Sequence, residues 1–566
     1  MLDIRTRLAK QAEALTGRPA QTFTGLFNLP PKGQADFCLP CFRLAKELKL
    51  PPQDLARQLA ENWPLDGIAD SAQAAGPYVN FRLHLPALLA AFAREPRFPS
   101  LVPADQHERL LVEYSQPNTH KAFHIGHIRN VAIGDSLVRL LRYNGHHVTA
   151  LNYIGDIGAH IAKFLWYYQQ QGCPVPEDDT TIGAFMGSIY VRASQTLASL
   201  AQEEKEQAQS AISRIQQQLE GRQSPELQEL WQRTRRYSLQ DFAQIYAFLN
   251  TCFDHVYYES DVEQEGIRLV RDLYEQGVLT KSQGAIVADL GEKLGVFLLL
   301  KSDGTSLYGT KEMSLAMRKQ DTYQPDRSLY VVASEQDLYF RQVQATLRHI
   351  GFPGWQNILH LSYELVVLQD QKMSSRVGNI VSFHDLKDAV MERIAREYLA
   401  DKDWPQAEKD ETAYRIALAT LRYGMLSKNR NKKVVFNLEG WLRPEGDTGA
   451  YILYTITRIN SILEKCPHIP AVEFPGYAPS DIERSLVMQA AEFSYQVLQA
   501  EKKLEPALLA NYAFSLCKLF NRFYHNHPVS QAKGNVFAFR FHLIRAVRAV
   551  LLKAVELMGF KPVARM

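Results

Sequence analysis

Residues 109–156 read RLLVEYSQPNTHKAFHIGHIRNVAIGDSLVRLLRYNGHHVTALNYIGD, and this stretch decides the fold. RLLVEYSQP (109–117) predicts a buried strand, residues 128–146 predict a helix that ends near Gly145, and residues 147–156 predict the next strand. A strand, a helix and a second strand form a βαβ unit. The sequence therefore predicts an α/β fold with a doubly wound parallel sheet.

Three histidines, His120, His124 and His127, lie in the turn between the first strand and the helix. They could form part of a metal site, although a structural zinc site needs four nitrogen or sulfur ligands and no cysteine is near, so a carboxylate would have to complete an open site. They could instead bind phosphate, because a helix N-terminus presents free N–H groups and a positive dipole end. Gly126 would let a nucleotide ring approach the backbone. The phosphate interpretation accounts for more of the segment.

A second polar segment, QDQKMSSRVGN (369–379), follows the strand-like LSYELVVL (361–368). It offers two cations, two hydroxyls and a flexible glycine, which would suit stabilisation of a leaving pyrophosphate. Taken alone, the segment reads as a polar surface turn. Its combination with the histidine turn on one doubly wound sheet favours the phosphate function.

Composition indicates a globular chain of several domains in a reducing compartment. The chain has 566 residues, of which 46% are hydrophobic, and six cysteines, too few for a disulfide framework. No apolar run reaches the roughly 18 residues that a spanning helix needs. The N-terminus carries Asp3 and Glu13 and reads as an amphipathic helix, not as a secretory signal. We therefore expect a cytoplasmic protein without membrane association.

Two further features have both a structural and a functional interpretation. Cys38 and Cys41 form a single CLPC, which could be a redox motif or half a zinc site, but packing in the core of a helical segment is favoured. Residues 511–566 contain nine Lys or Arg and one acid, and residues 426–436 form another basic cluster. Each could be a solvated helix face, and together they favour a polyanionic partner.

The chain divides into three predicted parts. Helices near 41–49 and 52–62 and a strand at 76–84 predict a small α+β domain over 1–105. Short strands at 284–290, 295–302 and 328–334 are expected to continue the parallel sheet, within a domain over 106–390 that carries a helical insertion at about 186–250, broken near 221–224. Strand signals stop after about 390, so residues 391–566 predict an all-α bundle.

Taken together, the motifs of this sequence resemble those of a known protein family. HIGH at 124–127 matches the first signature of class I aminoacyl-tRNA synthetases, and KMSSR at 372–376 is similar to their lysine–methionine–serine–lysine–serine loop. The flanks narrow the resemblance to arginyl-tRNA synthetases. They include VEYSQPNTHKAF, NYIGDIG, LKSDGTSLYGTKE, YVVASEQD, EGDTGAYILYTITR, FNRFYHN, the terminal PVARM and, near the start, FRLAKELKLPP and GPYVNFRL. The resemblance covers nearly the whole chain and implies a Rossmann-like catalytic domain; only residues 190–245 have no matching motif.

The resemblance implies an arginine–tRNA ligase, which couples L-arginine to ATP, releases pyrophosphate and passes the arginyl group to the terminal adenosine of tRNA(Arg). Mg²⁺ would accompany ATP, and no structural metal is expected. His124 and His127 would contact the ATP phosphates, and Gly126 would lie under the adenosine. Lys372, Met373, Ser374 and Ser375 would close over the pyrophosphate. Ser375 stands where the family has its second lysine, and Lys121 is hypothesised to supply the missing cation.

The arginine pocket has a clear physical requirement, since a buried guanidinium needs a carboxylate partner. The resemblance places Glu113 and Asn118 in the pocket, Tyr308 and Glu312 on the guanidinium side, and Gln336 in the polar lining. Without the resemblance, Tyr308 would be read as ordinary packing and Glu312 as a helix-start acid. Glu312 lies in Thr310-Lys311-Glu312 where the family usually has Thr-Arg-Asp, so its side chain is one methylene longer.

For tRNA, the resemblance places Tyr524 near the anticodon loop and Met566 in the terminal signature, while the first domain would reach the outer corner of the tRNA. A monomer is expected. Three rivals are a catalytically silent tRNA-binding paralogue, a class I enzyme for another amino acid, and a zinc protein built on the histidines. The HIGH, KMSSR, pocket and anticodon motifs argue against the first rival, and the second requires that Glu312 does not face the substrate.

Overall fold

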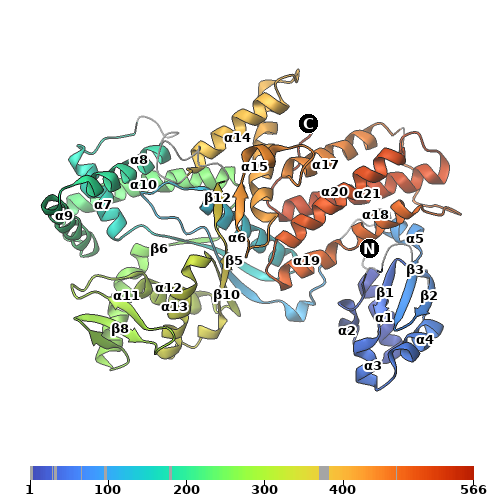
Figure 1. The fold of residues 1–566 in the computed structure, drawn as a ribbon, viewed down its shortest axis with the longest axis horizontal. Coiled ribbons are helices and arrows are strands. Elements are labelled where there is room, and N and C mark those ends of the chain that lie inside the picture. Colours follow the sequence, from blue (N-terminus) through green and yellow to red (C-terminus); the bar gives the residue numbers. More distant parts are fainter. Residues whose placement is uncertain are drawn as a thin grey trace.

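The computed structural model describes residues 4–566 with the exception of 29, 31–34, 66, 95–97, 177–181, 369–380 and 467. Figure 1 shows a central sheet with a group of helices on one side, the C-terminal helices on the other, and the N-terminal strands beside the C-terminal helices. Within the described part of the chain, no helix combines the length and apolarity needed to cross a membrane.

The central sheet is parallel throughout, in the order β11-β10-β4-β5-β6. Its strands are β4 (Arg109–Glu113), β5 (His147–Ile154), β6 (His255–Tyr258), β10 (Arg327–Ala333) and β11 (Ile358–Tyr363). Helix α6 (Ile125–Tyr143) connects β4 to β5 as predicted. The strand order reverses between β4 and β10, and ligands of open α/β sheets bind at such a switch point, outside the carboxyl ends of the strands. The predicted doubly wound fold is confirmed.

The prediction that residues 284–290 and 295–302 continue the parallel sheet is wrong. Strands β8 (Ala285–Asp289) and β9 (Val296–Leu300) form a separate antiparallel sheet with β7 (Thr280–Ser282). Only six residues join β8 to β9, and such a short connection suits an antiparallel hairpin, whereas a parallel pair needs a crossover of a dozen residues or more. The strand predicted at 328–334 does join the parallel sheet, as β10.

The chain between β5 and β6 forms a layer of helices, α7 to α10. They are α7 (Ala159–Gln170), α8 (Ile182–Ser199), α9 (Gln202–Glu220) and α10 (Pro225–Phe248). The predicted break near 221–224 is present, and Ser224 caps α10 by accepting a hydrogen bond from the backbone N–H of Leu227. Three further helices pack against strands of the parallel sheet or of the antiparallel sheet: α11 (Glu259–Glu275), α12 (Tyr308–Tyr323) and α13 (Asp337–His349).

The N-terminal part is an α+β unit with a three-stranded antiparallel sheet in the order β1-β3-β2. Its elements are α1 (Ile4–Thr16), α2 (Gln21–Thr24), β1 (Phe37–Pro40), α3 (Phe42–Leu48), α4 (Pro52–Asn62), β2 (Ala69–Ala75), β3 (Tyr78–Leu83) and α5 (Leu85–Arg94). Cys38 and Cys41 are both buried, as the core-packing interpretation predicted, but Cys38 lies in β1 and Cys41 precedes α3. The CLPC therefore spans a strand end and not one helical face.

The C-terminal part is helical, with one strand that the sequence did not predict. Strand β13 (Val434–Phe436) pairs in parallel with β12 (Val366–Leu368), and three residues are too few for a periodic pattern. The helices are α14 (Phe383–Tyr398), α15 (Gln406–Leu426), α16 (Leu438–Leu442), α17 (Gly449–Glu464), α18 (Asp481–Ala491), α19 (Phe493–Lys502), α20 (Ala507–Asn526) and α21 (Gly534–Leu557).

Outside the C-terminal part, single 3₁₀ turns occupy Ala104–Gln106, Ser334–Gln336 and Trp355–Asn357.

A buried arginine connects α6 to the C-terminal helices. Arg422 of α15 is 1% exposed, pairs with Asp135 of α6 at 2.7 Å, and donates to the carbonyls of Leu249 and Met558. Gly559 follows in the left-handed region at φ +84°, and a Cβ there would collide with the Arg422 guanidinium. The helix that begins at the histidine turn is therefore fixed against the last helix of the chain.

A second buried ion pair connects the N-terminal unit to the C-terminal helices. Arg5 of α1 pairs with Glu492 at 2.7 Å, and both side chains are 6% exposed. The same guanidinium donates to the carbonyl of Phe27 at 2.6 Å and lies 3.6 Å above the ring of Tyr495. Hydrogen bonds from Arg5 to Glu492 and to the carbonyls of Thr24 and Phe27 offset the cost of burying this guanidinium.

Candidate active site

The two HIGH histidines cap the first turn of α6. The backbone N–H of Gly126 donates to Nδ1 of His124 at 3.1 Å, and the backbone N–H of His124 donates to Nδ1 of His127 at 3.1 Å. The two ring centroids are 3.9 Å apart. Because each Nδ1 accepts, each neutral ring carries its proton on Nε2 and can donate from that atom. The rings thus form a pair of hydrogen-bond donors at the carboxyl end of β4.

Both histidines are neutral over the physiological range. Burial lowers the pKa of His124 to about 4, and the neighbouring Lys121 ammonium lowers it in the same direction. Burial lowers the pKa of His127 well below its ordinary value, with smaller contributions from His124 and Lys121. A bound anion would oppose these effects, so the site is arranged to hold negative charge.

Lys121 lies at the edge of this pair and contacts α8. Its Nζ is 5.3 Å from the ring centroid of Tyr190, and Nζ of Lys163 is 4.3 Å from the same centroid. Lys163 also donates to Oγ of Ser194 at 2.8 Å. The two lysines share an aromatic neighbour, but Lys121 is the one that influences both histidines.

Lys372, Met373, Ser374 and Ser375 lie outside the described residues. The described residue on the C-terminal side of that segment, Val381, accepts from the backbone N–H of Ile125 at 3.2 Å, and Phe383 N–H donates to the carbonyl of Phe123 at 2.7 Å. On the N-terminal side, Arg129 of α6 donates to the carbonyl of Leu365 at 3.2 Å. The flanks of the lysine segment are therefore hydrogen-bonded to the histidine turn and to α6.

The residues predicted to bind arginine gather at the carboxyl ends of β4 and β5 and on α12. Glu113 is the last residue of β4 and is 1% exposed. Its Oε2 is paired with Nζ of Lys319, and its Oε1 accepts from Gln116 at 2.9 Å. Asn118 forms a β-bridge with Gly155, where an added Cβ would collide with the Asn118 side chain.

Glu113 and Glu259 each pair with a lysine, whereas Glu312 forms no such ion pair within the described part of the chain. Burial raises its pKa to about 8, the charges of Glu113 and Glu259 act in the same direction, and Lys319 partly opposes them. A guanidinium beside it would supply the missing positive charge. The side chain is thus suited to bind a cation, and the assignment of Glu312 to the guanidinium stays a prediction.

The two other predicted lining residues are more open. Tyr308 begins α12 and is 54% exposed, and the Nζ of Lys311 lies 5.8 Å from its ring centroid. Gln336 ends the 3₁₀ turn after β10 and is exposed. Tyr308 begins α12 and Gln336 follows β10, both at the carboxyl edge of the sheet. Neither side chain is enclosed by protein on all sides.

Sequence reasoning missed two ion pairs that shape the pocket. Lys319 is 2% exposed and binds Glu113 and, at 3.2 Å, the hydroxyl of Tyr330. Lys311 pairs with Glu259 at 2.8 Å and lies 3.8 Å from Glu263. These partners are 206 and 52 residues apart in the chain, so local pattern could not reveal them. The only local signal was a lysine on the apolar face of a helix.

His120 does not join the phosphate-facing pair. It is fully buried, its ring hydrogen-bonds the hydroxyls of Thr119 at 2.9 Å and Thr234 at 2.8 Å, and burial lowers its pKa to about 3. Across the described residues, no three His, Cys, Asp or Glu side chains are grouped so as to hold a metal ion.

The two residues predicted to contact tRNA lie in the C-terminal part of the chain, Tyr524 on a helix and Met566 beyond the last helix. Tyr524 on α20 is 37% exposed, and the guanidinium of Arg458 lies 5.3 Å from its ring centroid. Met566 lines a pocket of about 510 Å³ together with Tyr398 of α14 and Tyr454 of α17. Arg458 also donates to the hydroxyl of Tyr454 at 2.7 Å, so Arg458 and Tyr454 connect the two predicted residues.

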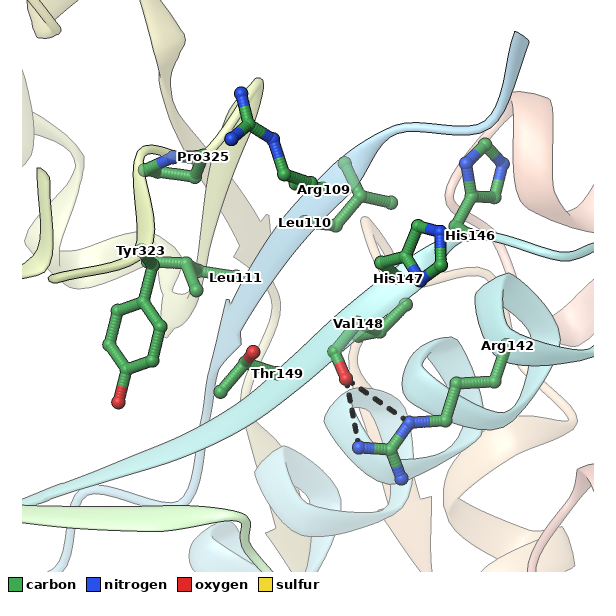
Figure 2. Close-up of a pocket in the computed structure, with 10 residues that line it drawn as sticks. All are labelled: Arg109, Leu110, Leu111, Arg142, His146, His147, Val148, Thr149, Tyr323 and Pro325. Carbon is green, nitrogen blue, oxygen red and sulfur yellow. Dashed lines mark hydrogen bonds between the residues drawn. The ribbon is translucent and has the colours of Figure 1, made fainter. Parts of the chain in front are cut away.

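Another pocket, of about 430 Å³, lies at the opposite edge of the parallel sheet (Figure 2). It is lined at the beginnings of β4 and β5, among others by Arg109, His147 and Tyr323. Arg142 there donates to the carbonyl of Val148 at 2.9 Å and to Asp254 at 2.5 Å. None of the residues predicted for the site lines this pocket.

Comparison with known proteins agrees with this geometry. The family of class I tRNA synthetase (R) catalytic domains matches residues 97–438, the DALR anticodon-binding domain matches 452–566, and the arginyl-tRNA synthetase N-terminal domain matches 3–83. An arginine–tRNA ligase of Bdellovibrio bacteriovorus is 35% identical over 95% of this chain and 93% of its own length. One of Clostridium perfringens is 30% identical over the full length of both chains.

Solved structures show the same architecture. Arginyl-tRNA synthetase from Thermus thermophilus superimposes with a TM-score of 0.81 over 99% of both chains, at 28% identity. The arginyl-tRNA synthetase of Plasmodium falciparum, at 18% identity, shares the fold with a TM-score of 0.74 over 100% of this chain and 98% of its own. The capped histidine pair, the acidic pocket beside it and these full-length matches lead to one conclusion: the chain belongs to the arginyl-tRNA synthetases, the arginine–tRNA ligases of class I.

Proposed function

We propose that the site at the carboxyl ends of β4 and β5 activates L-arginine with ATP to arginyl-adenylate and pyrophosphate, and that the arginyl group is then transferred to the 3′-terminal adenosine of tRNA(Arg). The observation that carries the proposal is the neighbourhood of two neutral, Nε2-protonated histidines and an acidic pocket at one switch point. Hydrogen-bond donors for phosphate lie beside carboxylates that can bind a cation. This arrangement suits a reaction that brings ATP and arginine together.

In this proposal His124 and His127 donate to the ATP phosphates and Gly126 lies beneath the adenosine. Activation is an in-line displacement at the α-phosphate, so the residues place the reactants and stabilise charge without a covalent intermediate. Lys121 and Lys372 stabilise the charge that develops on the pyrophosphate, and Met373, Ser374 and Ser375 belong to the closing segment. Mg²⁺ would accompany the ATP phosphates as part of the substrate.

On the arginine side, Glu312 accepts the guanidinium. Glu113 already has Lys319 and Gln116 as partners, so it stabilises the pocket charge and orients its neighbours more than it binds the guanidinium directly. Asn118 and Gln336 hold the polar end of the amino acid, and Tyr308 covers its stem. These roles rest on position and charge.

The remaining proposals concern the whole chain. Residues 1–105 would contact the outer corner of the tRNA, residues 106–390 would catalyse both steps, and residues 391–566 would bind the anticodon arm with Tyr524 and Met566. Unpaired bases are read by stacking and edge hydrogen bonds, for which an exposed tyrosine beside an arginine is suited. We further propose a monomer that acts in the cytoplasm.

One assay tests the proposed function. Amino-acid-dependent pyrophosphate exchange is measured with each amino acid, with and without tRNA, and with a zinc chelator in the presence of excess Mg²⁺. We expect exchange with arginine and with no other amino acid, dependent on tRNA and Mg²⁺ and unaffected by the chelator. Exchange with another amino acid would assign a different substrate, and a complete lack of exchange with retained tRNA binding would indicate a silent tRNA-binding paralogue.

A further inference from the structure

The turn that carries the histidines is held in an unusual backbone conformation. Ser115, Gln116 and His120 have φ values of +77°, +49° and +64°, in the left-handed region that favours glycine. Each such residue costs about 1–3 kcal/mol and persists only where its surroundings fix it. The structure must therefore contain the groups that keep this turn in place.

One ridge of helix α10 provides these groups. Thr234, Ser238, Phe242 and Tyr246 are spaced four residues apart, so their side chains lie along one face of the helix. Thr234, Ser238 and Phe242 are buried. We call these four residues the α10 ridge.

The first two members of the ridge hold His120 from both ends. Ser238 accepts a hydrogen bond from the backbone N–H of His120 at 2.9 Å. The hydroxyl of Thr234 donates to the carbonyl of Leu230 at 2.9 Å, which leaves its oxygen to accept from Nε2–H of His120 at 2.8 Å. The ring is neutral, since burial lowers its pKa to about 3, so a single Nε2 proton satisfies this bond.

The other two members hold the rest of the turn. The hydroxyl of Tyr246 is 2.8 Å from Oγ of Ser115 and accepts from Asn152 at 3.0 Å. Phe242 packs edge-on against Phe123, the residue before His124, with 6.0 Å between the ring centroids. The ridge thus contacts the turn at its start, its middle and its end.

We propose that the α10 ridge is the positioning element for amino-acid activation, with Thr234, Ser238 and Tyr246 holding the 115–123 turn so that Asn118, Lys121 and His124 meet their substrates. This gives the helical layer between β5 and β6 a task in the reaction, and it rests on the function proposed above. None of these ridge residues touches a reacting atom; they act through the turn.

The test compares Thr234→Val with matched variants. Valine has the shape of threonine but leaves Nε2–H of His120 buried without a partner. Thr346→Val is the control, because Thr346 is equally buried and its hydroxyl donates to its own helix, to the carbonyl of Gln342 at 2.8 Å. Thr234→Ser restores the hydroxyl. The readouts are kcat and KM for arginine-dependent pyrophosphate exchange, tRNA affinity, and deuterium exchange of the amides at 115–123.

We expect Thr234→Val to lower kcat about tenfold, because an unpaired buried donor would disfavour the active conformation of the turn by a factor of this order. Deuterium exchange of the turn should accelerate, while tRNA affinity stays unchanged. Thr234→Ser and Thr346→Val should remain within about twofold of wild type. In a His120→Gly background, where glycine adopts φ +64° freely and the bond is gone, Thr234→Val should have no further effect.

Several results would overturn the inference. They are equal kcat for Thr234→Val and Thr346→Val, unchanged deuterium exchange of the turn, or full additivity with His120→Gly. If Thr234→Val does not fold, Tyr246→Phe tests the other end of the ridge, with a severalfold loss of kcat expected. If the wild-type chain shows no arginine-dependent exchange, the proposed function is refuted but the ridge proposal is not. Deuterium exchange of the turn in the variants still decides whether the ridge holds the turn.

Discussion

His124 and His127 face each other across the first turn of α6, with ring centroids 3.9 Å apart and each Nδ1 occupied by a backbone N–H. Both rings therefore offer Nε2–H to solvent or substrate while remaining uncharged. In the proposed role, the pair would donate hydrogen bonds to phosphate without bringing two further positive charges beside Lys121.

The first prediction concerns the protonation of this pair. Because burial lowers the pKa of His124 to about 4, its ring should stay neutral as the pH falls from 8 to about 5. Binding of a non-hydrolysable ATP analogue should raise that pKa, since a nearby anion favours the charged ring. Carbon-labelled histidine followed by NMR over this pH range measures both effects; titration of His124 near its ordinary value in the free protein would contradict the expectation.

The second prediction concerns Glu312. Burial raises its pKa to about 8, so the carboxylate proposed to bind arginine becomes more populated as the pH rises toward that value. The kcat/KM for arginine should therefore rise with pH over this range. Glu312→Gln should abolish the dependence and lower kcat/KM at least about 100-fold, while Glu312→Asp should retain activity.

The same acid should oppose folding. A carboxyl whose pKa is raised in the folded state makes the free energy of unfolding fall as the pH rises from its ordinary range to about 8. Glu312→Gln removes that effect. The variant should therefore be more stable than wild type at pH 8 and lose this advantage in acid, as urea unfolding at both pH values would show; equal stability at pH 8 would mean that Glu312 is not buried as a costly charge.

Lys121 is the next residue to test. If its charge stabilises the ATP phosphates, Lys121→Ala should lower arginine-dependent exchange roughly 10- to 100-fold, the usual worth of a charge-assisted bond. Lys163→Ala is the matched control, since Lys163 lies over the same Tyr190 ring. An unchanged exchange rate for Lys121→Ala would remove the residue from the mechanism.

Tyr524 should contribute to tRNA affinity. Loss of one base-stacking ring usually weakens binding by about 1–3 kcal/mol, so Tyr524→Ala should raise the Kd for tRNA(Arg) by about 5- to 100-fold. Tyr524→Phe should bind nearly as wild type, because the ring remains. Filter binding at fixed salt measures both, and equal Kd values for the alanine variant and wild type would place the anticodon elsewhere.

The buried Arg5–Glu492 pair sets the stability of the N-terminal interface. Arg5→Ala leaves Glu492 buried without its partner and should cost about 3–5 kcal/mol. The exposed pair Arg43–Glu47 is the comparison, and Arg43→Ala should cost less than about 0.5 kcal/mol. Urea unfolding of both variants measures the difference; similar costs would show that the interface relaxes around the lost arginine.

Local patterns in the chain predicted those parts of the fold that local physics decides. The βαβ unit around α6 was predictable because a strand, a capped helix and a second strand each have their own periodicity. Pairing partners are not local, which is why β8 and β9 were assigned to the wrong sheet. Strand β13, of three residues, has too little pattern to detect.

The residues of the candidate site also divide into those with a local sequence signal and those without one. His124, His127 and Glu312 stand in short motifs, so the sequence alone can propose them for the site, but Lys319 and Thr234 act through partners more than 100 residues away. Their types gave only weak signals: a lysine on an apolar face, and a threonine and a serine four residues apart in a helix. Which face of α10 meets the histidine turn is decided by tertiary packing.

The contact between Arg422 and Gly559 limits how this chain can exchange parts with its relatives. Arg422 fills the space that a side chain at 559 would need, and it reaches Asp135 on the helix that begins at the histidine turn. A hybrid gene that joins the catalytic half of one relative to the tail of another must keep the aspartate, the arginine and the glycine together. The three positions span 424 residues of the chain (559 − 135), so a hybrid that changes one of them without the others should be less stable.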